Sequence, residues 1–128
     1  MMKKNYPKLS LRKNALIIEF HHSENLRWSN YLDVLLDFDK ETMAPSAIEI
    51  IDLAGHLGLE TINFTEFKLE NNDLHWKGYY DAEYDIFYIA FKKNLKAILK
   101  TEPVKGRVSI NQDNGIDAIE ILDYSAKN

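Results

Sequence analysis

The chain has 128 residues, of which 45% are hydrophobic and 12% aromatic, and its formal net charge is −4 at pH 7. This length fits one ordinary domain or two very small ones, and the aromatic content argues against a disordered chain. The lack of cysteine excludes disulfides and thiolate metal sites and suits a reducing compartment, so we expect a cytoplasmic protein. The apolar segment 15–20 (ALIIEF) is too short for a signal peptide or a membrane span, and it contains the charged residue Glu19.

The first part of the chain contains three segments rich in Ile, Leu, Val and Phe, which predict β-strands at residues 14–20, 31–38 and 46–52. The last two are separated by the polar loop 39–45, which ends in Pro45. The second part predicts five strands, at residues 76–80, 86–91, 96–101, 107–111 and 116–122. Residues 111–115 (NQDNG) are a strong hairpin signal, because Asn-Gly tolerates positive φ.

Two sequence blocks recur at the same spacing. Residues 47–52 read AIEIID and residues 118–123 read AIEILD, a shift of 71 positions. The same shift maps Ile18 onto Ile89 and Phe20 onto Phe91, so that ALIIEF corresponds to IFYIAF. We infer a tandem duplication: a first β repeat at residues 1–56, an acidic joint at 57–75 and a second β repeat at 76–128, together forming one compact domain.

The predicted fold is therefore mainly β, with two antiparallel β-meander repeats packed about a pseudo-twofold axis. One repeat of about 50 residues buries too little apolar area to be robust alone, and an identical unit is the nearest cover for its apolar face. We expect a monomer that folds as its own pseudo-dimer, or a homodimer. The pattern of the joint fits either a strand or one short helix.

The second repeat carries a recognisable pattern. Its residues 80–91 (YDAEYDIFYIAF) and 116–125 (IDAIEILDYS) resemble a family of short prokaryotic proteins that read YDxxxDxLYIxF and end near GIEILxxS, the domain of unknown function 2283. The first repeat matches only in ALIIEF, LLDFD and AIEIID. Ala47 and Ala118 replace the glycine of the pattern, and Leu9-Ser10 stand where its Tyr-Asp is expected. The resemblance implies a β fold and no known activity.

The densest aromatic stretch supplies candidates for a partner-binding surface: Trp76, Tyr79, Tyr84 and Tyr88. Tyr and Trp are favoured at interfaces because they bury area and keep a polar tip, but they also suit a small β core. Strand alternation places Phe87, Ile89 and Phe91 on one face, which we expect to be the core.

The repeated carboxylates are candidates for a small-molecule or metal-ion site between the repeats: Glu49, Asp52, Glu120 and Asp123. Such a site requires them to converge; otherwise the two glutamates belong to the solvated face of their strands. The neighbours His21 and His22 point to opposite sides of an extended chain and cannot easily share one ion. We predict no catalytic residue, metal or cofactor, because no nucleotide-binding, zinc-protease or serine-hydrolase motif is present.

Residues 57–85 hold seven acidic side chains against two basic ones. This excess argues against direct nucleic-acid binding, which requires clustered Lys and Arg, and its simplest interpretation is a solvated connector. The sequence favours a non-enzymatic module that binds another protein, such as a basic toxin or nuclease bound by an antitoxin- or immunity-like protein. The alternatives are the hydrolytic or ligand-binding site between the repeats and a structural subunit of a larger assembly.

Overall fold

The computed structural model describes residues 6–12, 15–21, 26–40, 42–71, 74–92 and 98–122. This part of the chain contains nine strands and one short helix. Their bounds are β1 Lys8–Arg12, β2 Ala15–Glu19, β3 Leu26–Asp39, β4 Pro45–Ile51, α1 Leu53–Leu57, β5 Phe67–Asn71, β6 Leu74–Asp81, β7 Ile86–Ala90, β8 Ile98–Asn111 and β9 Ile116–Leu122.

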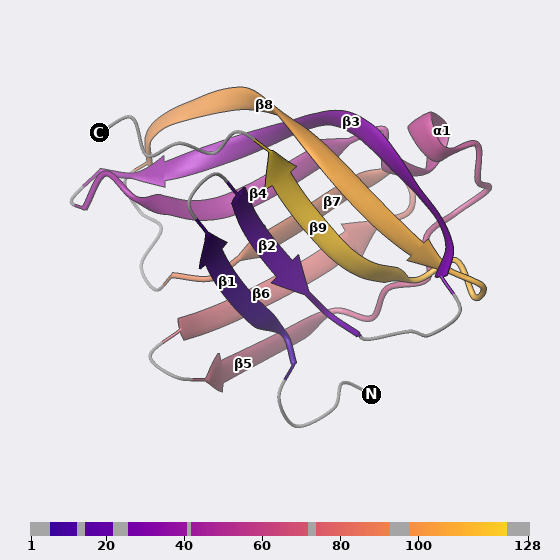
Figure 1. Ribbon diagram of the computed structural model, residues 1–128, viewed down its shortest axis with the longest axis horizontal. Helices are drawn as coiled ribbons and strands as arrows, with labels where there is room; N and C mark the ends of the chain where they lie inside the picture. The colour runs from indigo at the N-terminus through magenta and orange to yellow at the C-terminus, as the bar shows by residue number, and fades with distance from the viewer. Residues whose placement is uncertain are drawn as a thin grey trace.

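All nine strands form one antiparallel sheet in the order β1-β2-β9-β8-β3-β4-β7-β6-β5. The long strands β3 and β8 pair along their lengths at its centre, and both bend strongly (Figure 1). The sheet curls so that its two ends approach each other, and β1 and β5 are the outermost strands among the described residues. The mainly β prediction is confirmed.

The sheet is pseudo-symmetric about an axis between β3 and β8. Outward from the axis, β3, β4, β7 and β6 correspond to β8, β9, β2 and β1. The paired strands match in length for β3 and β8, for β4 and β9 and for β2 and β7. A β-bulge also occurs at equivalent places in the two halves. It follows Asp37 where β3 pairs with β4, and it follows Ser109 where β8 pairs with β9. The first four strands are thus interleaved with the last four, since β2 pairs with β9 and β4 with β7.

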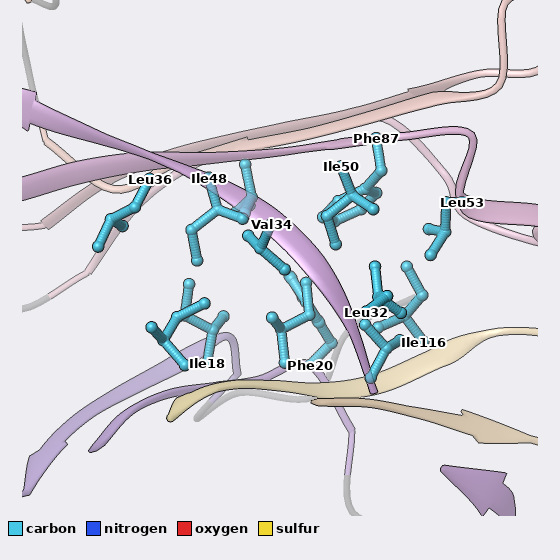
Figure 2. Close-up of a cluster of buried hydrophobic side chains, with 14 of the residues drawn as sticks. Ile18, Phe20, Leu32, Val34, Leu36, Ile48, Ile50, Leu53, Phe87 and Ile116 are labelled. Atoms are coloured by element: carbon cyan, nitrogen blue, oxygen red, sulfur yellow. The ribbon is translucent and has the colours of Figure 1, made fainter. Parts of the chain in front are cut away.

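The inner face of the curled sheet encloses one hydrophobic core. Alternate residues of every central strand are buried there, as the period of two requires. Figure 2 shows Val34, Leu36 and Ile48 of β3 and β4 facing Ile18 of β2 and Phe20 just beyond it. Phe87, Ile89 and Phe91 are each at most 1% exposed, so the predicted core face of residues 86–91 is confirmed.

Several strand boundaries differ from the sequence prediction. Residues 96–101 and 107–111 were expected as two strands, but one continuous strand, β8, runs through Pro103 and Gly106. The edge strand β1 was not expected. The strand register also corrects the alignment of the Tyr-Asp with which the family pattern opens. Arg12 pairs with Ala15 in the first half as Asp81 pairs with Ile86 in the second. Leu11-Arg12, rather than Leu9-Ser10, therefore correspond to Tyr80-Asp81.

The joint is neither all strand nor all helix. The helix α1 precedes it, residues 59–66 have no regular structure, and β5 follows. The Asn-Gly turn is confirmed: the Asn111 N–H donates to the Gly115 carbonyl at 3.0 Å, and Asn114 adopts φ 61°. No helix in the described ranges has the length and apolar character needed to cross a membrane.

Candidate binding site between the ends of the sheet

A pocket of about 610 Å³ lies where the two ends of the sheet approach each other. Its lining comes from the first half (Tyr6, Phe20, His21), from the joint (residues 63–69) and from the β8–β9 hairpin (Asn111, Asp113, Gly115, Ile116). Its size falls within the roughly 300–1,000 Å³ that is usual for ligand sites. The joint therefore forms one wall of the pocket.

Aromatic rings form the floor of this pocket. Phe20 lies edge-to-face against Phe64 and Phe67, with centroids 5.5 Å and 6.5 Å away. Phe87 contacts both Phe20 and Phe64 in the same geometry, which anchors the floor to the core. Phe64 and Phe67 are only half-buried, so they retain apolar surface for a ligand.

A polar network borders the floor. The buried carboxylate of Asp117 accepts a 2.8 Å hydrogen bond from the Asn111 amide, and its Oδ1 lies 3.6 Å from Nδ1 of His21. The backbone of the joint is held to the same hairpin, because the Asn63 N–H donates to the Asn114 carbonyl at 2.9 Å. Asn111 and His21 therefore place polar atoms at the border of the pocket, and the Asp117 carboxylate lies against both.

The pocket also adjoins an open strand edge. In the described part of the chain, β5 pairs only with β6. Backbone groups alternate sides along a strand. The Phe91 N–H donates to the Ser46 carbonyl, so the odd-numbered residues at this end of β7 bond to β4 and the even-numbered residues bond to β6. Carried across β6, the same alternation leaves the N–H and C=O groups of Lys68 and Glu70 in β5 on the open edge. Phe67 and Leu69 point to the inner face and line the pocket.

The predicted partner-binding aromatics divide into three groups. Trp76 is only 2% exposed and packs on Phe91 with centroids 6.0 Å apart, so its assignment to a binding surface was wrong and it belongs to the core. Tyr79 and Tyr88 are cross-strand neighbours on the outer face, with centroids 5.4 Å apart. Tyr84 is 68% exposed in the β6–β7 turn. None of the four lines the pocket.

The predicted carboxylates do not converge. Glu49 lies on β4 and Glu120 on β9, with β3 and β8 between them, which separates them by three strand spacings, roughly 14 Å, across the sheet. The register offsets them further along the strands, because Glu49 lies opposite Leu35 of β3, whereas Glu120 lies level with Tyr31. Asp52 lies beyond the end of β4, where it precedes α1. Asp123 lies outside the described residues. The expectation that these side chains form one site is therefore wrong for the three described ones.

Sequence reasoning missed three buried or bonded carboxylates, Asp37, Asp85 and Asp117. Asp37 is 1% exposed on the outer side of β3, and Asp85 accepts hydrogen bonds from the backbone of α1. For Asp85 a signal existed, since it is the last aspartate of the Tyr-Asp-x-x-x-Asp pattern. Asp37 had no such signal, because alternation alone places it on a solvated face.

Within the part of the chain that the structure describes, no three His, Asp or Glu side chains gather in a way that could hold a metal ion. Comparison of the chain with protein-family models, with curated proteins and with solved structures found no match.

Proposed function

We propose that the protein is a non-enzymatic protein-binding module that takes an extended segment of a partner along the open edge of β5. The observation that carries this proposal is the position of the pocket directly beside that edge. A strand added there gains backbone hydrogen bonds and a place for an apolar side chain at the same time, which is how β-addition combines affinity with specificity.

The details of the edge favour this mode of binding. Lys68 and Glu70 offer backbone donors and acceptors two residues apart, which is the repeat of a strand ladder. Leu69, between them, is 39% exposed and points toward the pocket, where an inward side chain of the added strand would cover it. The five residues of β5 set the length of the segment, about 17 Å.

The charge of this region indicates the kind of segment. Residues 57–85 carry seven acidic side chains against two basic ones, and the lining of the pocket holds Glu66 and Asp113 against Lys68. Complementary charge speeds association and excludes wrong partners. The preferred segment is therefore apolar at its centre and basic at its flanks.

A substitution at the edge tests the proposal. Linear peptides are first selected from a displayed library on the wild-type chain. Lys68→Pro removes one N–H from the open edge without touching the ladder to β6, because that N–H faces away from β6. We expect Lys68→Pro to weaken the selected peptides at least tenfold, whereas Lys68→Ala, which loses the same charge and keeps the N–H, changes affinity less than threefold. Equal affinity for Lys68→Pro and wild type would contradict strand addition.

A second candidate is a small molecule held in the same pocket. It is favoured by the lining, which comes from both halves and the joint, and by the aromatic floor. A ligand of this kind would lose affinity in Phe64→Ala and be indifferent to Lys68→Pro. A peptide would respond to both, so the two variants separate the candidates.

We further infer that the chain is a tandem duplication of a unit like the domain of unknown function 2283. The matched strand lengths, the common register and the repeated bulge support this origin. Single-copy proteins with the same motif should then form twofold dimers in solution, which light scattering can measure. A clean monomer of such a protein would contradict the inference.

A further inference from the structure

The two halves of the sheet differ at one cross-strand pair on the outer face. In the second half Arg107 of β8 lies opposite Glu120 of β9, and Nη2 donates to Oε1 at 2.8 Å. The corresponding residues of the first half are Leu35 of β3 and Glu49 of β4, which lie opposite each other in the same register. The first half therefore keeps the glutamate and lacks the arginine.

The first half also adds a second carboxylate beside that glutamate. Asp37 takes the place that Ser109 has in the other half, and it is 1% exposed. Its Oδ1 accepts a 2.6 Å hydrogen bond from the Thr101 hydroxyl, while Oδ2 has no hydrogen-bond donor in the described part of the chain. Burying an ionised carboxylate is costly unless a cation or donors compensate it.

Glu49 lies two residues along β4 from Ala47, the cross-strand partner of Asp37, so the two carboxyl groups are neighbours on the outer face. Burial raises the pKa of Glu49, and the neighbouring carboxyl group of Asp37 raises it further. Among the described lysines, arginines and histidines, none forms an ion pair with either side chain. Within the described residues, the pair therefore lacks the positive charge that Arg107 supplies to Glu120.

An aromatic wall stands on the other side of Glu49. Tyr88 of β7 lies directly opposite it, where the second half has Ile17 opposite Glu120. Tyr79 stacks against Tyr88 with an interplanar angle of 31°. Burial and the charges of Asp37 and Glu49 raise the pKa of Tyr88 to about 12, so its ring stays neutral. Tyrosine faces attract cations, and a planar guanidinium can stack on them.

We propose that Glu49 and Tyr88, with the negative charge of the buried Asp37 beside them, form a binding site for the guanidinium group of an arginine side chain presented by a partner protein. Arg107 on Glu120 is the internal example of the same contact in the other half. Guanidinium fits better than ammonium, because its rigid fork can pair with the Glu49 carboxylate while its plane lies on the Tyr88 ring. The site is on the outer face and does not depend on the pocket. A negative result for strand addition at β5 would therefore leave this proposal unaffected.

Titration of the full chain with N-acetylarginine amide, followed by ¹H–¹⁵N NMR, tests the site. We expect saturable shifts centred on the amides of Asp37, Glu49 and Tyr88. N-acetylcitrulline amide, which has the same shape without the charge, should cause none, and N-acetyllysine amide should bind at least threefold more weakly. Equal shifts with the citrulline analogue, equal affinity for the lysine analogue, or no saturation at these amides would overturn the proposal.

A variant that supplies the missing arginine gives an independent test. Leu35→Arg places a guanidinium opposite Glu49 as Arg107 is placed opposite Glu120. It should weaken arginine amide at least tenfold and lower the pKa of Glu49, read from its ¹³C carboxyl shift. The matched control Leu35→Gln should leave affinity within twofold. Wild-type affinity in folded Leu35→Arg would overturn the proposal, as would wild-type affinity in Glu49→Gln, which keeps the size of the side chain and removes its charge.

Discussion

The hydroxyl of Tyr80 donates a 2.5 Å hydrogen bond to Asp85, and the same carboxylate accepts the N–H groups of Ala54 and Gly55 at 2.9 Å and 3.0 Å. Asp85, in the second half, thus caps the first turn of α1, in the first half. The residue in the N-cap position, Asp52, makes no side-chain cap bond of its own. The Tyr-Asp-x-x-x-Asp pattern therefore has a structural role here, because it ties one half to the helix of the other.

Loss of this cap should destabilise the whole domain. We expect Asp85→Ala to lower the free energy of unfolding by about 2 kcal/mol at pH 7, because two backbone N–H groups and the Tyr80 hydroxyl lose their acceptor. Urea denaturation followed by circular dichroism measures the change. Glu83→Ala, an exposed position in the same turn, is the control and should change stability by less than about 0.5 kcal/mol. Equal effects of the two variants would argue against the cap.

The same carboxylate predicts a pH dependence. Burial alone would raise the pKa of Asp85, but the hydrogen bonds from Tyr80, Ala54 and Gly55 outweigh it and hold the pKa below its usual value of 3.8. A lowered pKa stabilises the fold above the unfolded value and ceases to do so as pH falls through the folded value. The stability difference between wild type and Asp85→Asn should be constant from pH 7 to 5 and shrink below pH 3.8. A difference that grows on acidification would contradict this assignment.

Phe20 is predicted to be a main link between the two ends of the sheet. It is 4% exposed, and it makes edge-to-face contacts with Phe87 of β7, beyond the pseudo-twofold axis in the strand order, and with Phe64 of the segment before β5. Phe20→Ala should cost about 4 kcal/mol in chemical denaturation, the usual cost of removing a buried phenylalanine. Tyr31→Ala, on the exposed outer face, serves as the comparison and should cost little. A small effect at Phe20 would mean that the ends of the sheet do not depend on this contact.

Gly106 and Val34 are predicted to be energetically coupled. A Cβ added at Gly106 would lie 2.6 Å from Cγ2 of Val34, in the tightly packed centre of the β3–β8 pair. Gly106→Ala should therefore cost about 2 kcal/mol in the wild type through overpacking. In the Val34→Ala background the same change should cost less than about half of that, because the colliding methyl is gone. A double-mutant cycle that is additive within about 0.3 kcal/mol would contradict the contact.

Local pattern was sufficient for much of the fold. The alternation of residues 86–91 predicted the buried face, the Asn-Gly turn predicted the β8–β9 hairpin, and the repeated AIEI blocks fell on β4 and β9, which occupy equivalent places in the sheet. Each of these features depends on residues that are close together in the chain or on the two-residue period of a strand. Both are visible in the sequence itself. The division of residues 96–111 into two strands failed because Pro103 and Gly106 read as breaks, whereas the paired strand β3 holds them in one ladder.

The candidate sites depended on contacts that sequence does not state. Strand order is set by pairing between distant segments, so the separation of Glu49 from Glu120 could not be read from their equivalent positions. Trp76 was assigned to a surface because aromatic composition does not distinguish the two faces of β6. The pocket is lined by Phe20, Phe64 and Asn111, which come together only when the sheet curls. Their spacing in the sequence follows no pattern that predicts this contact.

Hydrogen exchange at single amides of β5 tests the central claim most directly. The amides of Lys68 and Glu70 face the open edge, whereas those of Phe67 and Leu69 already bond to β6. A saturating peptide chosen from the displayed library should slow exchange at Lys68 and Glu70 at least tenfold and leave Phe67 and Leu69 within about twofold. Unchanged exchange at Lys68 and Glu70 in a saturated complex would contradict strand addition at this edge.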